Sequence, residues 1–267
     1  MIRKPAVAGR FYTANEGSLK KQLADFTAQK EKKIEALGVV SPHAGYVYSG
    51  GVAGRVLSSI APKPTYVILG TNHTGAGKPF GLDAERAWKT PLGEVTVDSE
   101  LAEAILKDSR YIEKDFLCHD GEHSIEVQLP FLQFLNKNFT FVPIEISQAS
   151  GQAYKDIGRG LARAQKKLKK DIVIIASSDM THYEPHREAE KKDMLAIEKI
   201  LALDIDGFLG TVEKYNISMC GTAPTAVMLA SVIELGATKA KLIKYATSAE
   251  ASGDYSAVVG YAGIVVY

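Results

Sequence analysis

The sequence predicts an α/β fold in which helices pack on a central sheet. Short apolar runs bounded by turn residues alternate with segments of helical periodicity along the whole chain. Hydrophobic residues make up 46% and charged residues 24% of the 267 positions, a composition that allows a large buried core. No linker, internal repeat or low-complexity tract breaks the pattern, so we expect a single domain over residues 1–267.

The individual elements follow from local composition. Strands are expected where apolar and β-branched residues cluster, at 36–40, 65–69, 139–146, 171–176, 241–247 and 256–267. Helices are expected at 18–33, 51–60, 99–106, 124–135, 150–170, 187–202 and 222–235. Asp98 and Ser99 are expected to cap the third helix, and Pro130 to bend the fourth. Residues 75–97, rich in Gly and Pro, are expected to form a loop and a hairpin.

Charge and cysteine content narrow the class of protein. With 32 basic and 31 acidic residues the net charge is +1, which creates no field that would attract nucleic acid or anionic lipid. No stretch approaches the ~20 apolar residues of a membrane span, and we expect no signal peptide, because no long apolar stretch follows residues 1–5 (MIRKP). Cys118 and Cys220 lie far apart, and we expect free thiols. We therefore expect a cytoplasmic protein with no nucleic-acid or membrane partner.

Three predicted strands run into segments that carry histidine. The first is followed by His43, the second by His73, and the 171–176 strand by Asp179 and His182. Ligands of open α/β sheets bind at the carboxyl ends of the strands. If these strands are parallel, the four side chains open onto one rim; the alternative is that each is a turn or capping residue.

Cys220 lies in residues 217–224 (ISMCGTAP), directly before a predicted helix. Thr222 is a candidate cap for that helix, and Pro224 suits its first turn. A thiol at a helix N-terminus has its thiolate stabilised, which suits a metal ligand or a nucleophile. The alternative is a small buried apolar residue, a common environment for free cysteine.

His119 and His123 match the H-x-x-E-H pattern of zinc peptidases. That pattern requires a helix that places both histidines on one face. Asp120 and Gly121 are poor helix formers, so the peptidase interpretation is disfavoured. We expect instead a loop leading into a helix, with one or more of three residues facing the rim: Glu122, His123 and Glu126.

Six stretches of the chain together resemble the Memo-like family, in order and along its length. They are 5–12 (PAVAGRFY), 41–50 (SPHAGYVYSG), 69–73 (LGTNH), 122–130 (EHSIEVQLP), 177–183 (SSDMTHY) and 219–221 (MCG). The resemblance implies a fold similar to class III (LigB-type) extradiol dioxygenases, an α/β sandwich with a central mixed sheet flanked by helices. It also implies a functional link to a radical-SAM enzyme.

The resemblance further implies a single metal site for iron(II) or copper, with His43, His73 and Cys220 as ligands. Asp179, His182 and His123 are implied to lie nearby. Two imidazoles and one anionic ligand leave open positions on a redox metal. A thiolate replaces the carboxylate of the dioxygenases, and its softness favours copper(I), zinc or reduced iron; zinc is a metal that purified protein can carry.

The expected roles follow from this arrangement. His182 is the expected general acid or base, with Asp179 fixing its tautomer or holding a substrate proton. Substrate is expected to contact His123, Glu122 and Tyr46. The ligand is expected to be a small molecule or a peptide, and the sequence leaves the oligomeric state open, a homodimer being one assembly it allows.

Three functions remain open at this point. The first is a metal-dependent redox protein with a dioxygenase-like pocket. The second is a non-catalytic module that binds a peptide or small molecule in the same pocket, indicated by the tyrosines in the pocket segments, Tyr12, Tyr46, Tyr48 and Tyr183. The third is metal-free cysteine chemistry through Cys220, with His43 or His182 as the base.

Overall fold

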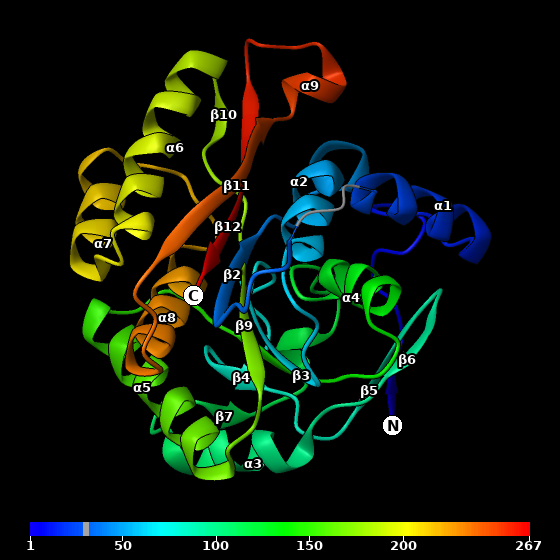
Figure 1. Ribbon diagram of the computed structural model, residues 1–267, viewed down its shortest axis with the longest axis vertical. Coiled ribbons are helices and arrows are strands. Elements are labelled where there is room, and N and C mark those ends of the chain that lie inside the picture. Colours follow the sequence, from blue (N-terminus) through cyan, green and yellow to red (C-terminus); the bar gives the residue numbers. More distant parts are fainter. Residues whose placement is uncertain (29–31) are drawn as a thin grey trace.

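A computed structural model of the chain describes residues 1–28 and 32–267 and contains one large and one small sheet (Figure 1). The strands of the large sheet are β2 (Gly38–Ser41), β3 (Thr65–Gly70), β4 (Gly81–Leu82), β7 (Glu113–Lys114), β8 (Thr140–Glu145), β9 (Ile172–Ser177), β10 (His182–Glu184), β11 (Ala240–Thr247) and β12 (Val258–Val266). They are arranged in the order β10-β12-β2-β9-β3-β8-β4-β7, and β11 pairs with β12. The small sheet contains β1 (Ile2–Arg3), β5 (Ala87–Thr90) and β6 (Gly93–Val95).

The centre of the large sheet is parallel. β2 pairs with β9, β9 with β3 and β3 with β8, all in the same direction. β12 runs antiparallel to β2, β10 and β11, so the sheet is mixed. Because the carboxyl ends of parallel strands meet at one edge, the segments that follow β2, β3 and β9 emerge side by side.

Helices cover both faces of this sheet (Figure 1). One layer contains α1 (Glu16–Thr27), α2 (Tyr46–Ser58) and α4 (Leu129–Leu135), and the other contains α5 (Gly151–Leu168), α6 (His186–Leu201), α7 (Ile205–Lys214) and α8 (Thr222–Glu234). The remaining helices are α3 (Ser99–Asp108), α9 (Ala249–Ser252) and the 3-10 turns η1 (Leu117–His119) and η2 (Glu126–Gln128). The predicted class, a central mixed sheet flanked by helices, is confirmed.

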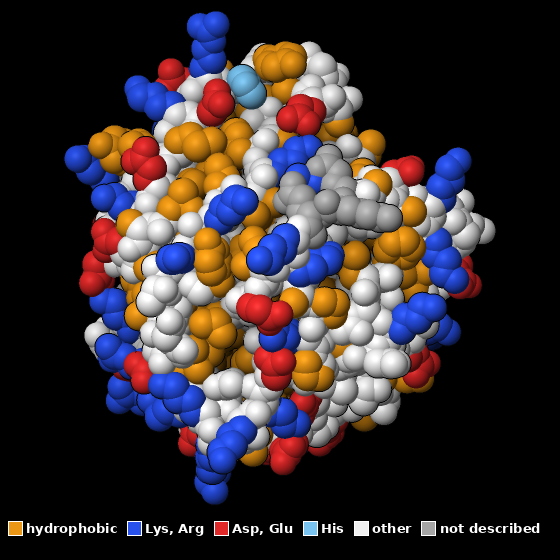
Figure 2. Space-filling view, in the orientation of Figure 1, with side chains coloured by type: hydrophobic (Ala, Val, Ile, Leu, Met, Phe, Trp, Pro, Cys, Tyr) orange, Lys and Arg blue, Asp and Glu red, His pale blue; other side chains and the backbone are white. Residues whose placement is uncertain are grey.

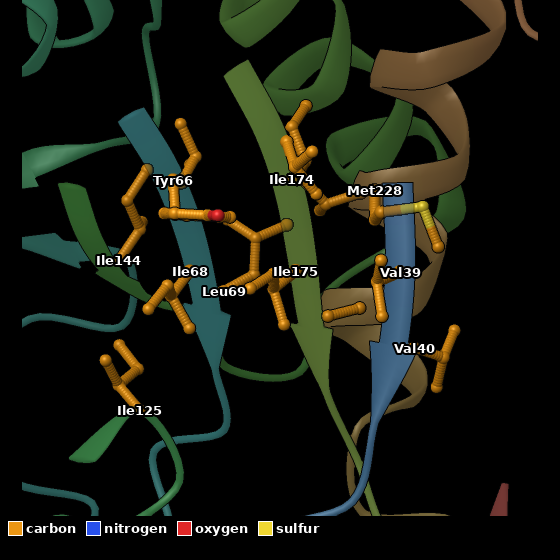
Figure 3. Close-up of a cluster of buried hydrophobic side chains, with 14 of the residues drawn as sticks. Val39, Val40, Tyr66, Ile68, Leu69, Ile125, Ile144, Ile174, Ile175 and Met228 are labelled. Carbon is orange, nitrogen blue, oxygen red and sulfur yellow. The ribbon is translucent and has the colours of Figure 1, made fainter. Parts of the chain in front are cut away.

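The parallel strands are buried on both sides, which explains their continuous runs of apolar residues. Figure 3 shows side chains of β2, β3 and β9 interleaved with residues from the neighbouring elements. Ile174 and Ile175 are fully buried, and each such side chain contributes roughly 1.5–3 kcal/mol on burial. Gly38 lets α8 approach β2 closely, since a Cβ at that position would lie 2.5 Å from Met228 Sδ.

Several predicted boundaries are corrected. α1 ends at Thr27, whereas the predicted helix spans 18–33, because the apolar residues that pack all precede Thr27. Ala28, Lys32 and Lys33 are not helical. Residues 29–31 of the predicted helix lie outside the described residues. Pro130 is the second residue of α4 and lies in its first turn, where its missing N–H costs nothing, so it does not bend the helix interior as predicted.

Other differences have equally local causes. α2 begins at Tyr46, five residues before the predicted start, because burial of the Tyr46 ring overrides the weak helix propensity of aromatic and β-branched residues. Its N-terminal amide donates to Phe11 O, 2.8 Å away. Gly221 and not Thr222 is the N-cap of α8. α7 was not predicted, since Gly207 and Gly210 weaken its helical pattern.

On the face shown in Figure 2, basic and acidic side chains are interspersed over the surface. Such mixing matches the near-neutral net charge of the whole chain. Among the described residues, every helix is too short or too polar to cross a bilayer.

Candidate metal centre

Four predicted site residues lie at one edge of the large sheet. His43 follows β2, His73 follows β3, Asp179 follows β9, and His182 is the first residue of β10. The parallel pairing of β2, β9 and β3 brings these segments together, as predicted from the sequence. His123 joins them from the segment between η1 and η2.

The tautomer of His43 is fixed by a chain of hydrogen bonds. Ser177 Oγ donates its only proton to Ser124 O, 2.6 Å away, because a carbonyl can only accept. The same oxygen accepts from Gln128 Nε2 at 2.8 Å and lies 3.0 Å from His43 Nδ1. His43 Nδ1 must therefore carry a proton, and its Nε2 atom keeps a free lone pair.

Glu122 fixes the other two imidazoles. One of its oxygens lies 3.0 Å from His73 Nδ1 and 3.1 Å from His123 Nδ1. The carboxylate also accepts the backbone amides of His73 and His123, each at 2.7 Å. Burial alone would raise the pKa of Glu122, but hydrogen bonds from His123 and His73 lower it well below its ordinary value. An ionised acceptor holds Nδ1 as the protonated nitrogen on both rings, so that in the neutral imidazoles the lone pair is on Nε2.

The three imidazoles form a compact cluster. One ring nitrogen from each of His43, His73 and His123 lies within 4.8 Å of the others. The ring centroids are 5.2 Å apart for His43 and His73, 5.4 Å for His43 and His123, and 4.7 Å for His73 and His123. Burial, followed by the charges of His123 and His73, lowers the pKa of His43 well below its usual value, so its ring is neutral. Neutral imidazoles are the form that binds metals.

Cys220 adds sulfur to this cluster. Its Sγ atom lies 3.2 Å from His43 Nε2 and accepts the amide of Asp179 at 3.3 Å. Burial, and then the charge of Asp179, raises the pKa of the Cys220 thiol. The expected stabilised thiolate is therefore wrong for the metal-free site, since the proximity of α8 does not offset burial. A metal would have to displace the thiol proton.

His182 and Asp179 do not act on one another directly. His182 Nδ1 lies 2.8 Å from Ser218 O, a carbonyl that can only accept, so Nδ1 is protonated here too. Asp179 Oδ1 accepts the amides of His43 at 2.8 Å and Ala44 at 3.3 Å. Burial raises the pKa of Asp179, and the His43 amide opposes this rise. Asp179 thus holds the segment after β2 in place.

These groups open into a cavity of about 690 Å³. It is lined by Phe11, His43, Ala44, Gly45, Tyr48, His73, His123, Asp179, His182, Tyr183, Ser248, Ser252, Asp254, Ala257, Val259 and Tyr261. Tyr183 is 80% exposed and has a left-handed φ of 59°. A non-glycine residue in this conformation stores strain, and such residues cluster at functional sites.

The chain matches a known protein family along almost its whole length. The family model described as "Memo-like protein" matches residues 3–265. The chain belongs to the Memo-like family. A MEMO1 family protein of Methanopyrus kandleri is 44% identical over 279 residues, covering 99% of each chain. A MEMO1 family protein of Pyrobaculum aerophilum is 43% identical over 278 residues, covering 100% of this chain and 99% of the other.

A solved structure shares the fold of this Memo-like chain. The crystal structure of an uncharacterized protein of Escherichia coli K12 superposes with a TM-score of 0.55 at 11% sequence identity. The match covers 85% of this chain and 98% of that chain. At this identity the similarity concerns the fold alone.

Two residues expected to contact substrate lie behind the cavity wall in this Memo-like chain. Tyr46 is 2% exposed, and its hydroxyl donates to Val127 O at 2.6 Å. Glu122 is 1% exposed and turned toward the imidazoles that it holds. His123, in contrast, lines the cavity. The structure therefore brings His123, but neither Tyr46 nor Glu122, to the surface that a ligand would touch.

The remaining acidic and histidine candidates face inward. Glu126, expected near the rim, accepts from the guanidinium of Arg3 at 2.7 Å and from Tyr12 Oη at 2.7 Å. His119 is fully buried beside Trp88, with ring centroids 5.3 Å apart. Because η1 ends at His119, this residue and His123 do not share a helical face, and the peptidase interpretation fails.

Three contributors were missed by reasoning from the residues. Phe11 lines the cavity, with its ring centroid 4.7 Å from that of His123. Ser177 and Gln128 fix the His43 tautomer through contacts between positions 49 and 134 residues apart in the chain. All three lie in stretches that resemble the family, but periodicity and composition carry no signal for contacts at such separations.

Proposed function

We propose that this Memo-like protein is a metal-dependent redox protein that holds one iron or copper ion beside a dioxygenase-like cavity. The observation that supports it is the cluster of His43, His73 and His123, whose Nδ1 protons are fixed by protein acceptors. Orienting hydrogen bonds of this kind are typical of metal-binding histidines.

The donor set fits such a metal. Imidazole nitrogen suits iron, copper and zinc, and thiolate sulfur favours copper(I), zinc and reduced iron. His43 and His73 would be ligands in either arrangement, with Cys220 as the third ligand indicated by the family resemblance and His123 as the third indicated by proximity. When bound, the metal would supply one-electron chemistry at positions left open by the protein.

His182 would move a proton at the substrate. Its Nδ1 proton is committed to Ser218 O, so the Nε2 atom is the one that can accept or return a proton. Asp179 would keep His43 in position through the two amides it accepts.

Metal analysis of protein purified without a histidine tag tests this proposal. We expect one equivalent of iron or copper per chain after anaerobic loading, and loss of that metal in His43→Ala and His73→Ala. His186→Ala is the matched control. His186 Nδ1 lies 3.0 Å from Thr247 Oγ1, and His186 is not among the residues described as lining the cavity. If the wild type carries only zinc, or no metal above background, after loading, the proposal is wrong.

A non-catalytic binding module is the second candidate, favoured by the size and aromatic lining of the cavity. It predicts ligand binding without turnover. Oxygen consumption that depends on an added substrate and disappears in His182→Ala would exclude this candidate.

A further inference from the structure

The cavity wall above the histidines is built from flat rings. Phe11, Tyr48, Tyr183 and Tyr261 all line it. The Tyr183 and Tyr48 side chains are 80% and 46% exposed, so both rings lie where a ligand would enter. Aromatic faces bind planar ligands by stacking, and they attract cations through their negative faces.

Apart from its histidines, the ionisable side chains described along the cavity wall that carry charge near neutral pH are acidic. Its carboxylates are Asp179 and Asp254, and its lining, as far as the structure describes it, contains no lysine or arginine. Asp254 is exposed, and its Oδ1 accepts from Ser256 N at 2.8 Å and Ser256 Oγ at 2.6 Å. These hydrogen bonds lower the pKa of Asp254, so it is ionised near neutral pH. Arg10 and Lys21 line an adjoining cavity that shares Phe11 and Tyr48 with this one.

A helix N-terminus beside the cavity could still favour an anion, but the amide of its first residue, Tyr46, is already bound by the protein. α2 begins next to the lining residue Gly45. The Tyr46 amide donates to Phe11 O at 2.8 Å, and the Ala44 amide to Asp179 Oδ1 at 3.3 Å. Protein sites for carboxylate or phosphate groups commonly supply arginine or lysine, and neither is among the residues described along this cavity.

We infer that the cavity binds a planar aromatic ligand whose substituent is positively charged and discriminates against ligands whose substituent is negative. The aromatic part would stack among Phe11, Tyr48 and Tyr183, and the cationic group would face Asp254. The inference rests on the proposed function in one respect only: the end of the ligand that reacts at the metal would lie beside the histidines.

Three phenols that differ in the charge of their tail test it: tyramine (positive), 4-ethylphenol (neutral) and 4-hydroxyphenylacetate (negative). Each is titrated calorimetrically into metal-loaded and into metal-free protein at low salt. We expect tyramine to bind about three- to tenfold more tightly than 4-hydroxyphenylacetate, with 4-ethylphenol between them, the range expected for an exposed charge pair. Raising the salt concentration should narrow the difference.

Two variants assign the charge effect. Asp254→Asn should remove most of the preference for tyramine, while Glu250→Gln, which removes the same charge from the exposed surface of neighbouring α9, should keep it. Tyr183→Ala should weaken all three ligands alike. Both charge variants alter exposed side chains, and thermal melts of each variant check that it is folded.

The outcomes separate this inference from the proposed function. A preference for tyramine in metal-free protein supports the inference even where no iron or copper is taken up. Metal uptake combined with no binding of any phenol, with tighter binding of the anion, or with a preference unchanged in Asp254→Asn overturns the inference and leaves the proposed function standing.

Discussion

His43 Nδ1 lies 3.0 Å from Ser177 Oγ, and that hydroxyl donates its proton away from the ring, to Ser124 O. The protein thus sets the protonation of His43 through a residue on a neighbouring strand. The same result, a protonated Nδ1 and a free Nε2, is reached at His73, His123 and His182 with different acceptors.

Ser177→Ala removes the acceptor and leaves the His43 Nδ1–H without its partner. We expect the affinity for the bound metal to fall about 10- to 100-fold, the usual cost of losing such an orienting partner. Ser231→Ala is the control, since Ser231 is equally buried but donates to Val227 O within α8. Competition titrations measure both, and an affinity within twofold of the wild type in Ser177→Ala would contradict the assignment.

The same substitution at two buried glutamates should affect metal binding differently. Glu122 is ionised and holds two imidazoles, so Glu122→Gln should weaken metal binding about 10- to 100-fold. Burial, and then the charge of Glu122, raises the pKa of Glu145 well above its ordinary value, so this carboxyl is neutral. Glu145→Gln therefore preserves its charge and should leave metal affinity unchanged. Equal effects of the two substitutions would refute this division.

Substitution of Cys220 should depend on the metal. Cys220→Ser should weaken copper(I) binding more than iron(II) binding, because the soft thiolate contributes most to the softer ion. His123→Ala should show the smaller difference between the two metals, since imidazole suits both. Parallel titrations with each metal under anaerobic conditions give the comparison. A loss in Cys220→Ser that is the same for both metals would argue against a thiolate ligand.

Asp98 should make stability depend on pH. Burial alone would raise its pKa, but the Leu101 amide and Lys170 lower it below the ordinary value of 3.8. Because the folded-state pKa is depressed, this stabilisation is present above the unfolded value and is lost as pH falls below about 4 through the folded value. Asp98→Asn should destabilise the protein by about 1 kcal/mol at pH 7, because the amide keeps the helix cap but loses the ion pair with Lys170.

Denaturant midpoints of the wild type and of Asp98→Asn at pH 7 and pH 3 measure this effect. The difference in midpoint between the wild type and Asp98→Asn should be smaller at pH 3 than at pH 7. Glu250→Gln, which alters an exposed residue, should have the same midpoint as the wild type at both pH values. A gap that widened on acidification would mean that the sign is wrong.

Much of the fold could be predicted because its signals are local. The runs that form β3 and β9 are continuous and apolar, and the Asp98 cap before α3 is a short-range pattern. The convergence of His43 and His73 followed from parallel strands alone. The start of α2 could not be predicted, because the buried contacts of Tyr46 outweigh its propensity, and neither could α7 with its two glycines.

The inner details of the site have no local signal. That Glu122 turns inward while His123 faces the cavity depends on a turn in which Gly121 has a φ of +80°. The role of Ser177 depends on two hydrogen bonds of its hydroxyl, which donates to Ser124 O and accepts from Gln128 Nε2. Such choices arise from packing between distant segments, which residue spacing along one segment does not encode.

The strands of the large sheet do not follow sequence order, and this has a consequence for how the protein folds. β12, from the far end of the sequence, lies between β2 and β10, and its residue Tyr261 lines the cavity whose first histidine, His43, follows β2. His123 comes from the middle of the chain and Cys220 from its later part. Proteolytic fragments from either half should therefore be unable to assemble the centre. During synthesis the outer edge of β2 would stay unpaired until β12 emerges and completes the sheet.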